Sequence, residues 1–409
     1  MMDSRAVGVK LQSNFVSFHA LEPKVERANG IKALAGFLLS GFLLALLGAI
    51  LPAWGYHRDP ADFSAVALYF ISLAAGIIGA SAFARRLIAR RGLSFLLVFA
   101  CALACVALAY LSMVSPPVSK WWRAGGLAAL GMSAGLLNLG LFYAISSGYQ
   151  RDAAGTVNRG GIWYGLGCLA ATLLVAGTFY AYSISSILVF MAAFPALFGL
   201  VYARTSFITQ ENREPPTAPG FQFRTPGVIL FALLLFFQFG NEWSIAGWLP
   251  IFLIRRVGLS PSSALLILAL YWSLLMIGRL VAVAALSRIR HGRLLMGSVL
   301  AALFGCLILF FTNNGFGAAT GACLLGAGYA SIYPLVAEAI GARFPSYHPG
   351  FFSGIFSLAL IGGLLAPATL GYAADAWGVG VVVGIPTIGT CLVMVLVPLI
   401  WLEAKVTGR

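Results

Sequence analysis

The feature that most constrains this chain is a series of twelve apolar segments separated by short polar breaks or by breaks containing Gly and Pro. About twenty apolar residues in a helix span the hydrocarbon core of a bilayer. The segments are expected at 32–56, 62–84, 93–115, 125–148, 160–181, 184–203, 227–254, 261–284, 294–313, 317–342, 351–374 and 379–402. The expected fold class is an all-α polytopic membrane protein, with twelve transmembrane helices in two pseudo-symmetric six-helix halves.

The breaks between the segments predict the domain organisation. A cytoplasmic N-terminal tail covers 1–31, and the N-terminal half covers 32–203. A cytoplasmic linker, rich in proline and charge, covers 204–226, because such a stretch cannot lie in lipid. The C-terminal half covers 227–402, and a short cytoplasmic tail covers 403–409.

Composition and charge exclude a soluble protein. Hydrophobic residues make up 60% of the chain and charged residues 9%, against about 25% charged in soluble domains. The net charge of +14 reflects 26 Lys and Arg against 12 Asp and Glu, and most of the basic residues fall on the side of the N-terminus. The positive-inside rule therefore places both termini in the cytoplasm. We expect contact with lipid, not nucleic acid, and a multi-pass protein of a bacterial inner (plasma) membrane.

The residues that enzymes and metal sites need are missing from the apolar segments. The four histidines, His19, His57, His291 and His348, fall in expected loops or in the tail. The six cysteines lie in apolar stretches without a CxxC pair, and no metalloprotease, nucleophile-elbow or Walker motif is present. We expect no enzyme activity, metal or bound cofactor, although a proton or a sodium ion could serve as a coupling ion.

Two basic stretches occupy the same place in each half, after the second and after the eighth segment. Here the chain resembles the major facilitator superfamily, in which a loop rich in Gly and Arg joins helices two and three and recurs, weaker, between helices eight and nine. Ala84 stands where the superfamily's motif carries an acid. A plain positive-inside loop is the alternative. The resemblance implies a gating role for these arginines: Arg85, Arg86, Arg90, Arg91, Arg288 and Arg290.

Charged residues inside the spans are few. Glu242 lies near the middle of the seventh segment, where a carboxyl can carry a coupling proton or accept hydrogen bonds from substrate hydroxyls. The alternative is a structural role, paired with another helix or at a break near Gly240. Arg279 and Glu338 fall in the cytoplasmic thirds of their segments, and we expect a gating ion pair between them or with Arg343.

Amide and aromatic side chains gather at comparable depth in several segments. Aromatic faces can stack on the CH face of a pyranose, while amides bind its hydroxyls. This pattern predicts a sugar site with Glu242 at its centre. The remaining candidate substrate-binding residues are Asn138, Asn158, Tyr164, Gln238, Asn241, Trp243, Trp248, Tyr271, Trp272, Tyr329 and Tyr333.

Three stretches resemble the fucose:proton symporter branch of the superfamily, including its sodium-dependent glucose transporter relatives. They are Gly240-x-Glu242 with Trp248, Leu270–Leu280, and Ser331–Leu335 followed by Gly362-Gly363 and Pro367. Proton-coupled members of that branch carry an acid in helix one and another in helix four. Neither segment of this chain has one, so Glu242 is the remaining central candidate, and sodium coupling or uniport stays open.

These patterns predict a secondary active transporter that moves a small polar solute by alternating access. We expect a monosaccharide, with protons coupled through Glu242, and a monomeric protein. The alternative is an exporter of drugs or other amphipathic compounds, because a carboxylate among aromatic side chains also suits cationic drugs.

Overall fold

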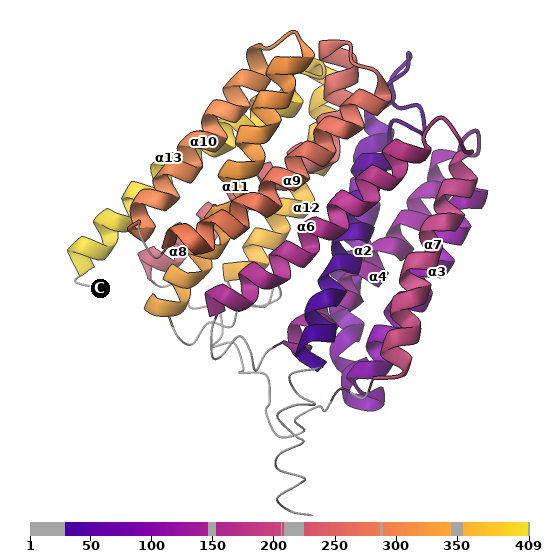
Figure 1. Ribbon diagram of the computed structural model, residues 1–409, viewed down its shortest axis with the longest axis horizontal. Coiled ribbons are helices and arrows are strands. Elements are labelled where there is room, and N and C mark those ends of the chain that lie inside the picture. The colour runs from indigo at the N-terminus through magenta and orange to yellow at the C-terminus, as the bar shows by residue number, and fades with distance from the viewer. Residues whose placement is uncertain are drawn as a thin grey trace, which may run out of the picture.

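The computed structural model describes residues 29–145, 153–205, 207, 225–286, 289–344 and 355–407, and every regular element in them is a helix (Figure 1). Twelve of these helices are long and apolar enough to cross a membrane, judged by length and composition. The predicted all-α fold with twelve spans is therefore confirmed. The N-terminal tail before Asn29 and most of the central linker lie outside the described residues.

The helices of the first half are Asn29–Ile50, α2 (Phe63–Arg91), α3 (Leu93–Met113), α4 (Lys120–Ala144), α6 (Ala153–Thr178) and α7 (Ile184–Ala203). Those of the second half are α8 (Pro226–Phe252), which continues as the π-helical turn η1 (Leu253–Val257), α9 (Pro261–Leu286), α10 (His291–Phe311), α11 (Gly315–Arg343), α12 (Ile355–Trp377) and α13 (Val381–Thr407). We call the end of the bundle at Asn29 and Thr407 the inner end, and the opposite end the outer end.

The two halves repeat the same helix neighbours. In the first half α2 packs on α4, α3 on α4, and α3 on α7. In the second half the corresponding pairs are α9 with α11, α10 with α11, and α10 with α13. The halves meet through α6 with α9 and through α12 with α2, which are again equivalent pairs. The first half lies at the right of Figure 1 and the second half at the left.

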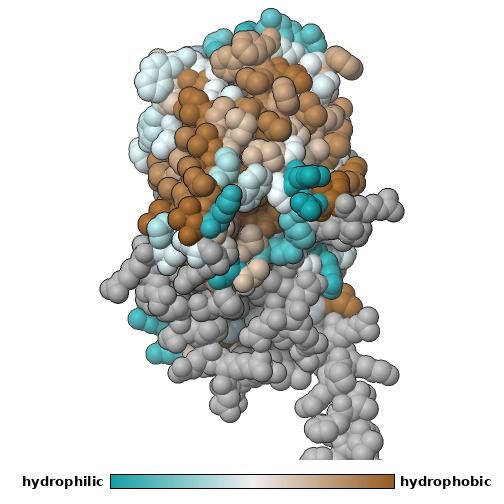
Figure 2. Space-filling view, turned by 90° about the vertical axis from the view of Figure 1, so that its left-hand side faces the viewer, coloured by the Kyte–Doolittle hydropathy of each residue, from teal (hydrophilic) through white to brown (hydrophobic). Residues whose placement is uncertain are grey.

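The outer surface of the bundle suits lipid. Large apolar side chains face outward along the helices, among them Val106 of α3, Phe190 of α7 and Phe304 of α10, each more than half exposed. Figure 2 shows a broad hydrophobic face, with hydrophilic residues at its top and in a band above the grey residues. In water this much exposed apolar surface would be unfavourable, but in a bilayer it costs nothing.

The basic stretch after the second span is helical, so the predicted loop there is wrong. α2 runs on to Arg91, and Arg85, Arg86 and Arg90 lie exposed on its last turns. Alanine, leucine and arginine, which make up most of this stretch, favour helix, so the helix does not stop at the membrane surface. The turn is made at Gly92, whose φ of +82° lies in the region that favours glycine.

The other predicted boundaries move by a few residues. α6 begins at Ala153 rather than 160, and α13 continues to Thr407, so that most of the expected C-terminal tail is helix. Near the second basic stretch, Arg290 is the N-cap of α10 and is exposed. Arg288 lies outside the described residues.

Candidate functional site

A cavity of about 930 Å³ lies between the two halves, and we call it the inner cavity. Its walls come from the first helix, α2, α4 and α6 of one half and from α8, α9, α11 and α12 of the other. It reaches from mid-depth, at Glu242, toward the inner end, where Ile145 and Thr156 line it.

A second cavity, of about 480 Å³, lies on the outer side of the first, and we call it the outer cavity. Leu44, Tyr164 and Trp243 line both cavities. The outer cavity is otherwise lined by residues nearer the outer end, including Gly48 and Trp272. The indole N–H of Trp272 is buried and has no hydrogen-bond partner among the described residues.

Glu242 and Arg279 face each other at the wall of the inner cavity. Their side chains are each 7% exposed, and Arg279 Nη2 lies 3.9 Å from Glu242 Oε1. This separation is an ion pair without a direct hydrogen bond. Side chains on a helix tilt toward its N-terminus, which for α9 is the outer end. Arg279 therefore reaches from the inner third of α9 toward the membrane centre.

The surroundings of Arg279 leave its guanidinium incompletely satisfied. Arg279 Nε is buried and makes no hydrogen bond within the described part of the chain. The guanidinium packs on Gly161 of α6, where a Cβ atom would overlap it. Asn158, one turn earlier on α6, donates from Nδ2 to the Arg279 carbonyl at 3.4 Å. Residues of α6, in the first half, therefore hold Arg279 of α9, in the second half, in place.

The predicted ion pair between Arg279 and Glu338, or with Arg343, is wrong. Glu338 lies near the inner end of α11 and pairs with His291 at the start of α10, at 3.0 Å. Arg343 instead pairs with Glu403 of α13. The reason is direction: Arg279 extends outward along α9, away from the inner end where the other two side chains lie.

The remaining polar groups of the inner cavity are few. Asn138 Oδ1 accepts a hydrogen bond from the Ser40 hydroxyl at 2.9 Å, and its Nδ2 donates to the Ala134 carbonyl at 3.0 Å. Tyr333 also lines the cavity and packs edge-to-face on Phe239. The predicted residues that line one or both cavities are Asn138, Tyr164, Glu242, Trp243, Trp272 and Tyr333, together with Arg279.

Several other predicted substrate-binding residues do not line either cavity. Asn241 points to α13 and donates to the Thr390 hydroxyl at 3.4 Å. Tyr329 shares the same hydroxyl at 3.1 Å. The Trp248 indole donates to the Pro367 carbonyl at 2.9 Å. Their hydrogen-bonding groups are used within the second half.

Gln238, Tyr271 and Asn158 are buried behind the cavity wall rather than in it. Gln238 lies one turn before Glu242, so both point to the same side of α8. The Tyr271 hydroxyl is buried and has no hydrogen-bond partner in the described residues. Asn158 Oδ1 is likewise buried without a partner there.

Sequence reasoning missed the aromatic and apolar part of the cavity wall. Phe37, Phe142 and Phe239 line the inner cavity with Thr156 and Pro334. A phenylalanine in a span can face lipid, core or cavity, and the sequence pattern is the same for all three. Only the placement of the helices distinguishes them.

The outer end is closed by contacts between the two halves. Trp248 of α8 packs on Phe63 and Phe70 of α2, with ring centroids 6.0 Å apart in both pairs. Arg255 of η1 donates to the His57 carbonyl at 3.1 Å and pairs with Asp59 at 2.9 Å. These contacts join the two halves at the outer end, on the side of the outer cavity.

The protonation of the His57 ring depends on the charges near it at the outer end. Burial, with the positive charges of Arg58 and Arg255, lowers the pKa of His57, although a backbone hydrogen bond at Pro52 opposes the shift. The neutral ring is therefore favoured in the closed outer end. Protonation would add a third positive charge beside two arginines.

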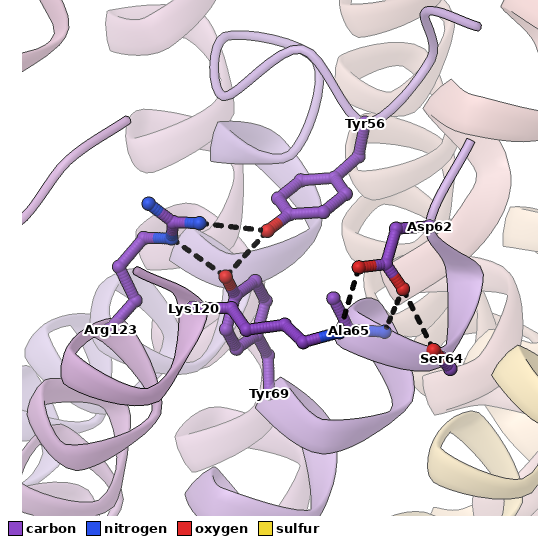
Figure 3. Close-up of polar contacts among 7 residues, drawn as sticks. All are labelled: Tyr56, Asp62, Ser64, Ala65, Tyr69, Lys120 and Arg123. Atoms are coloured by element: carbon purple, nitrogen blue, oxygen red, sulfur yellow. Dashed lines mark hydrogen bonds and ion pairs between the residues drawn. The ribbon is translucent and has the colours of Figure 1, made fainter. Parts of the chain in front are cut away.

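A buried arginine holds the segment that carries His57 to the first half. Arg123, in the first turn of α4, is 6% exposed. Its Nε donates to the Tyr69 hydroxyl at 2.6 Å and its Nη2 to the Tyr56 hydroxyl at 3.1 Å (Figure 3). Its Nη1 donates to the Val118 carbonyl at 2.5 Å. These bonds tie the segment after the first helix to α2 and α4.

Beside Arg123, Asp62 caps the start of α2 and pairs with Lys120 at 2.9 Å (Figure 3). Burial alone would raise the pKa of Asp62. Hydrogen bonds from Lys120, Ser64 and the Ala65 amide outweigh burial and hold the pKa of Asp62 below its ordinary value. The carboxylate therefore stabilises the fold at neutral pH.

Comparison with known proteins agrees with this architecture. The profile of the Major Facilitator Superfamily matches residues 159–360. An uncharacterised MFS-type transporter of Yersinia pestis is 22% identical over 382 residues, which cover 89% of this chain and 93% of the relative.

Two solved structures share the fold. The fucose:proton symporter FucP of E. coli is 17% identical, with a TM-score of 0.59 over 91% of this chain and 98% of that one. The nucleoside transporter NupG is 14% identical, with a TM-score of 0.69 over 92% of this chain and 99% of that one. By its family profile, its full-length relative and its fold, the chain is a member of the Major Facilitator Superfamily, a family of secondary transporters for small molecules and not of enzymes.

Proposed function

We propose that this transporter moves a small polar solute, with a monosaccharide as the first candidate, in symport with protons carried by Glu242. The observation behind this proposal is the Glu242–Arg279 pair at the wall of a cavity between the two halves. A carboxylate in this position can gain or lose a proton as the cavity changes sides. The charge of Glu242 then determines whether the positive charge of Arg279, which lines the same cavity, is compensated.

Alternating access follows from the arrangement of the contacts. In this structure the halves meet at the outer end, and the inner cavity extends toward the inner end. Rocking the halves about α6–α9 and α12–α2 would separate Trp248 from α2 and open the outer cavity. Leu44, Tyr164 and Trp243, which both cavities share, lie on the path of a solute between them.

Protonation of Glu242 is the step that couples the proton to this motion. While ionised, the carboxylate compensates the charge of Arg279 across 3.9 Å. Once protonated, it no longer does, and the guanidinium must find another partner. The gating role of the exposed arginines at the inner end of α2, the cytoplasmic placement of both termini, the inner-membrane location and a monomeric state belong to this proposal.

The residues that line the inner cavity indicate which chemical groups a substrate could have. Asn138, Thr156 and the ion pair can bind hydroxyl groups, and aromatic side chains can stack on a ring. By their names, FucP is a fucose:proton symporter and NupG is a nucleoside transporter. Fucose and nucleosides are both compounds with a ring and hydroxyl groups. The number of apolar side chains, Phe37, Phe142 and Phe239 among them, supports export of amphipathic compounds as the second candidate.

Uptake into proteoliposomes tests the proposal. A panel of labelled hexoses is supplied to reconstituted protein with and without an inward proton gradient. Saturable uptake that the gradient stimulates is expected for at least one hexose, and Glu242→Gln is expected to abolish the stimulation. Asp375→Asn, which removes an exposed acid at the outer end of α12, serves as the matched control. An unchanged gradient response in Glu242→Gln contradicts the coupling role.

A further inference from the structure

The charge balance around Arg279 points to the kind of solute that can accompany the proton. We propose that the co-transported solute is an organic carboxylate, whose anionic group takes the place of Glu242 opposite Arg279 when Glu242 is protonated. The inference rests on the proposed function, in which Glu242 accepts the coupling proton. The candidate solute then changes from a neutral monosaccharide to a carboxylate that also has a ring.

The first argument is the cost of an uncompensated buried charge. An arginine remains charged at any physiological pH. The Arg279 side chain is 7% exposed, and Glu242 is the only carboxylate of the described residues with which it forms an ion pair. Protonation of Glu242 with a neutral solute would leave a buried, unpaired guanidinium, which is strongly unfavourable. Protonation together with a carboxylate ligand keeps the site neutral.

The second argument is the loose geometry of the pair. A stable buried Arg–carboxylate pair is commonly bidentate, with two short hydrogen bonds. Here the nearest approach is 3.9 Å, and Arg279 Nε has no partner among the described residues. The guanidinium therefore keeps donors that an added carboxylate could use. Arg279 also lines the inner cavity, so a solute in that cavity can reach it.

Among the described residues, no other group near Glu242 could carry this charge change. Tyr164, Tyr271 and Cys168 lie within electrostatic reach of it, but phenols and thiols remain neutral near pH 7. The helices that pack against α8 carry their other acidic and basic residues near the helix ends. These are Arg255, Arg256, Glu338, Arg343, Asp375, Glu403 and Lys405, with Lys32 on the first helix, whose Gly48 lies against Ala246 of α8.

The rest of the cavity fits a carboxylate with a flat or ring-shaped apolar part. Phe37, Phe142 and Phe239 provide apolar surface, and Asn138 provides an amide on the opposite half. This chemistry is shared by sugar acids and by aromatic acids. The test therefore uses one acid of each kind with its neutral counterpart: D-glucuronate with D-glucose, and benzoate with benzyl alcohol.

Uptake in proteoliposomes is measured for the four compounds at an external pH of about 5.5 and about 7.5, with the membrane potential clamped by potassium and valinomycin. We expect saturable uptake of at least one acid, faster at the lower pH and independent of the potential, because one proton and one carboxylate carry no net charge. The neutral counterpart is expected to be taken up more slowly than its acid. Uptake of the neutral compound at least as fast as that of its acid would overturn the inference.

Binding to purified protein separates the roles of the two side chains. Arg279→Gln is expected to weaken binding of the transported acid about tenfold or more, since it removes a charged hydrogen-bond donor. Arg293→Gln, at an exposed arginine on the first turn of α10, is the control and should bind as the wild type does. Unchanged binding in Arg279→Gln, or no binding of either acid to the wild type, contradicts the inference.

Glu242→Gln mimics the protonated carboxyl and keeps the shape of the side chain. It is expected to bind the acid equally at both pH values, whereas the wild type should weaken by up to about tenfold per pH unit as Glu242 ionises. Proton-stimulated uptake of glucose without uptake of glucuronate or benzoate would leave the proposed function standing and remove the inference. Uptake of an acid with no pH dependence in the wild type would remove the coupling role of Glu242 instead.

Discussion

Neutralising the two charges of the Glu242–Arg279 pair one at a time measures how strongly they interact. At 3.9 Å two unit charges attract by about 4 kcal/mol with an effective dielectric constant of about 20. Removing one partner of a buried pair typically destabilises a protein by about 3–5 kcal/mol, because the other charge stays buried alone. Glu242→Gln and Arg279→Gln should each lower the free energy of unfolding by this amount.

The double variant should be far less destabilised than the sum of the two single variants. We expect a coupling energy of about 3 kcal/mol at pH 8, since two neutral amides leave no unpaired charge. The assay is equilibrium unfolding of purified protein in mixed detergent micelles, followed by tryptophan fluorescence. The same cycle at pH 5 should give a smaller coupling energy, because lower pH favours protonation of Glu242, which removes one charge of the pair.

A matched cycle uses Asp375→Asn and Arg293→Gln, two exposed residues at opposite ends of the second half. Their effects should add, as expected for sites that do not touch. If the effects of Glu242→Gln and Arg279→Gln also add to within about 0.5 kcal/mol, the two side chains do not interact. The reasoning about charge compensation in the cavity would then be wrong.

Three further predictions concern the support of the site and its outer closure. Gly161→Ala should reduce transport at least tenfold, because the added methyl group overlaps the guanidinium opposite it, whereas Gly160→Ala has room and should remain active in the same uptake assay. Arg255→Gln should increase labelling of a cysteine placed in the outer cavity, and so should a fall in external pH below about 6.5, since protonation of the His57 ring adds a positive charge at the closure. Equal labelling at pH 7.5 and pH 5 contradicts the second of these. Asp62→Asn should cost up to about 1 kcal/mol of stability at neutral pH. The loss should shrink as the pH falls below about 4, where the carboxyl of the unfolded chain becomes protonated, and should disappear only at a lower pH, where the folded carboxyl is protonated too, as melting curves against pH would show.

Much of the fold follows from local sequence patterns. Segments of about twenty apolar residues can be counted without knowing which helices touch. The ends of the helices were less predictable. Arg85 to Arg91 have good helix propensity, and α2 continues through them until Gly92. Hydropathy marks where a chain leaves lipid, but not where its helix stops.

The candidate site was only partly predictable, for a different reason. Glu242 and Arg279 are visible in the sequence because charges within spans are rare. Their pairing was not, since the sequence gives depth along each helix but not the direction of a long side chain. Asn241, adjacent to Glu242, faces Thr390 instead of the cavity, because neighbours on a helix point about 100° apart.

The sequence by itself determined that the chain spans a membrane twelve times, that basic residues gather on one side, and that one carboxyl lies at mid-depth. Hydrophobicity and charge act residue by residue, so they can be read along the chain. The tertiary structure alone decided which side chains share the cavity, that Arg279 turns toward Glu242 and not Glu338, and that Trp248 packs on α2 at the outer end. These depend on how helices distant in the sequence pack, rotate and approach each other, and no local pattern encodes that.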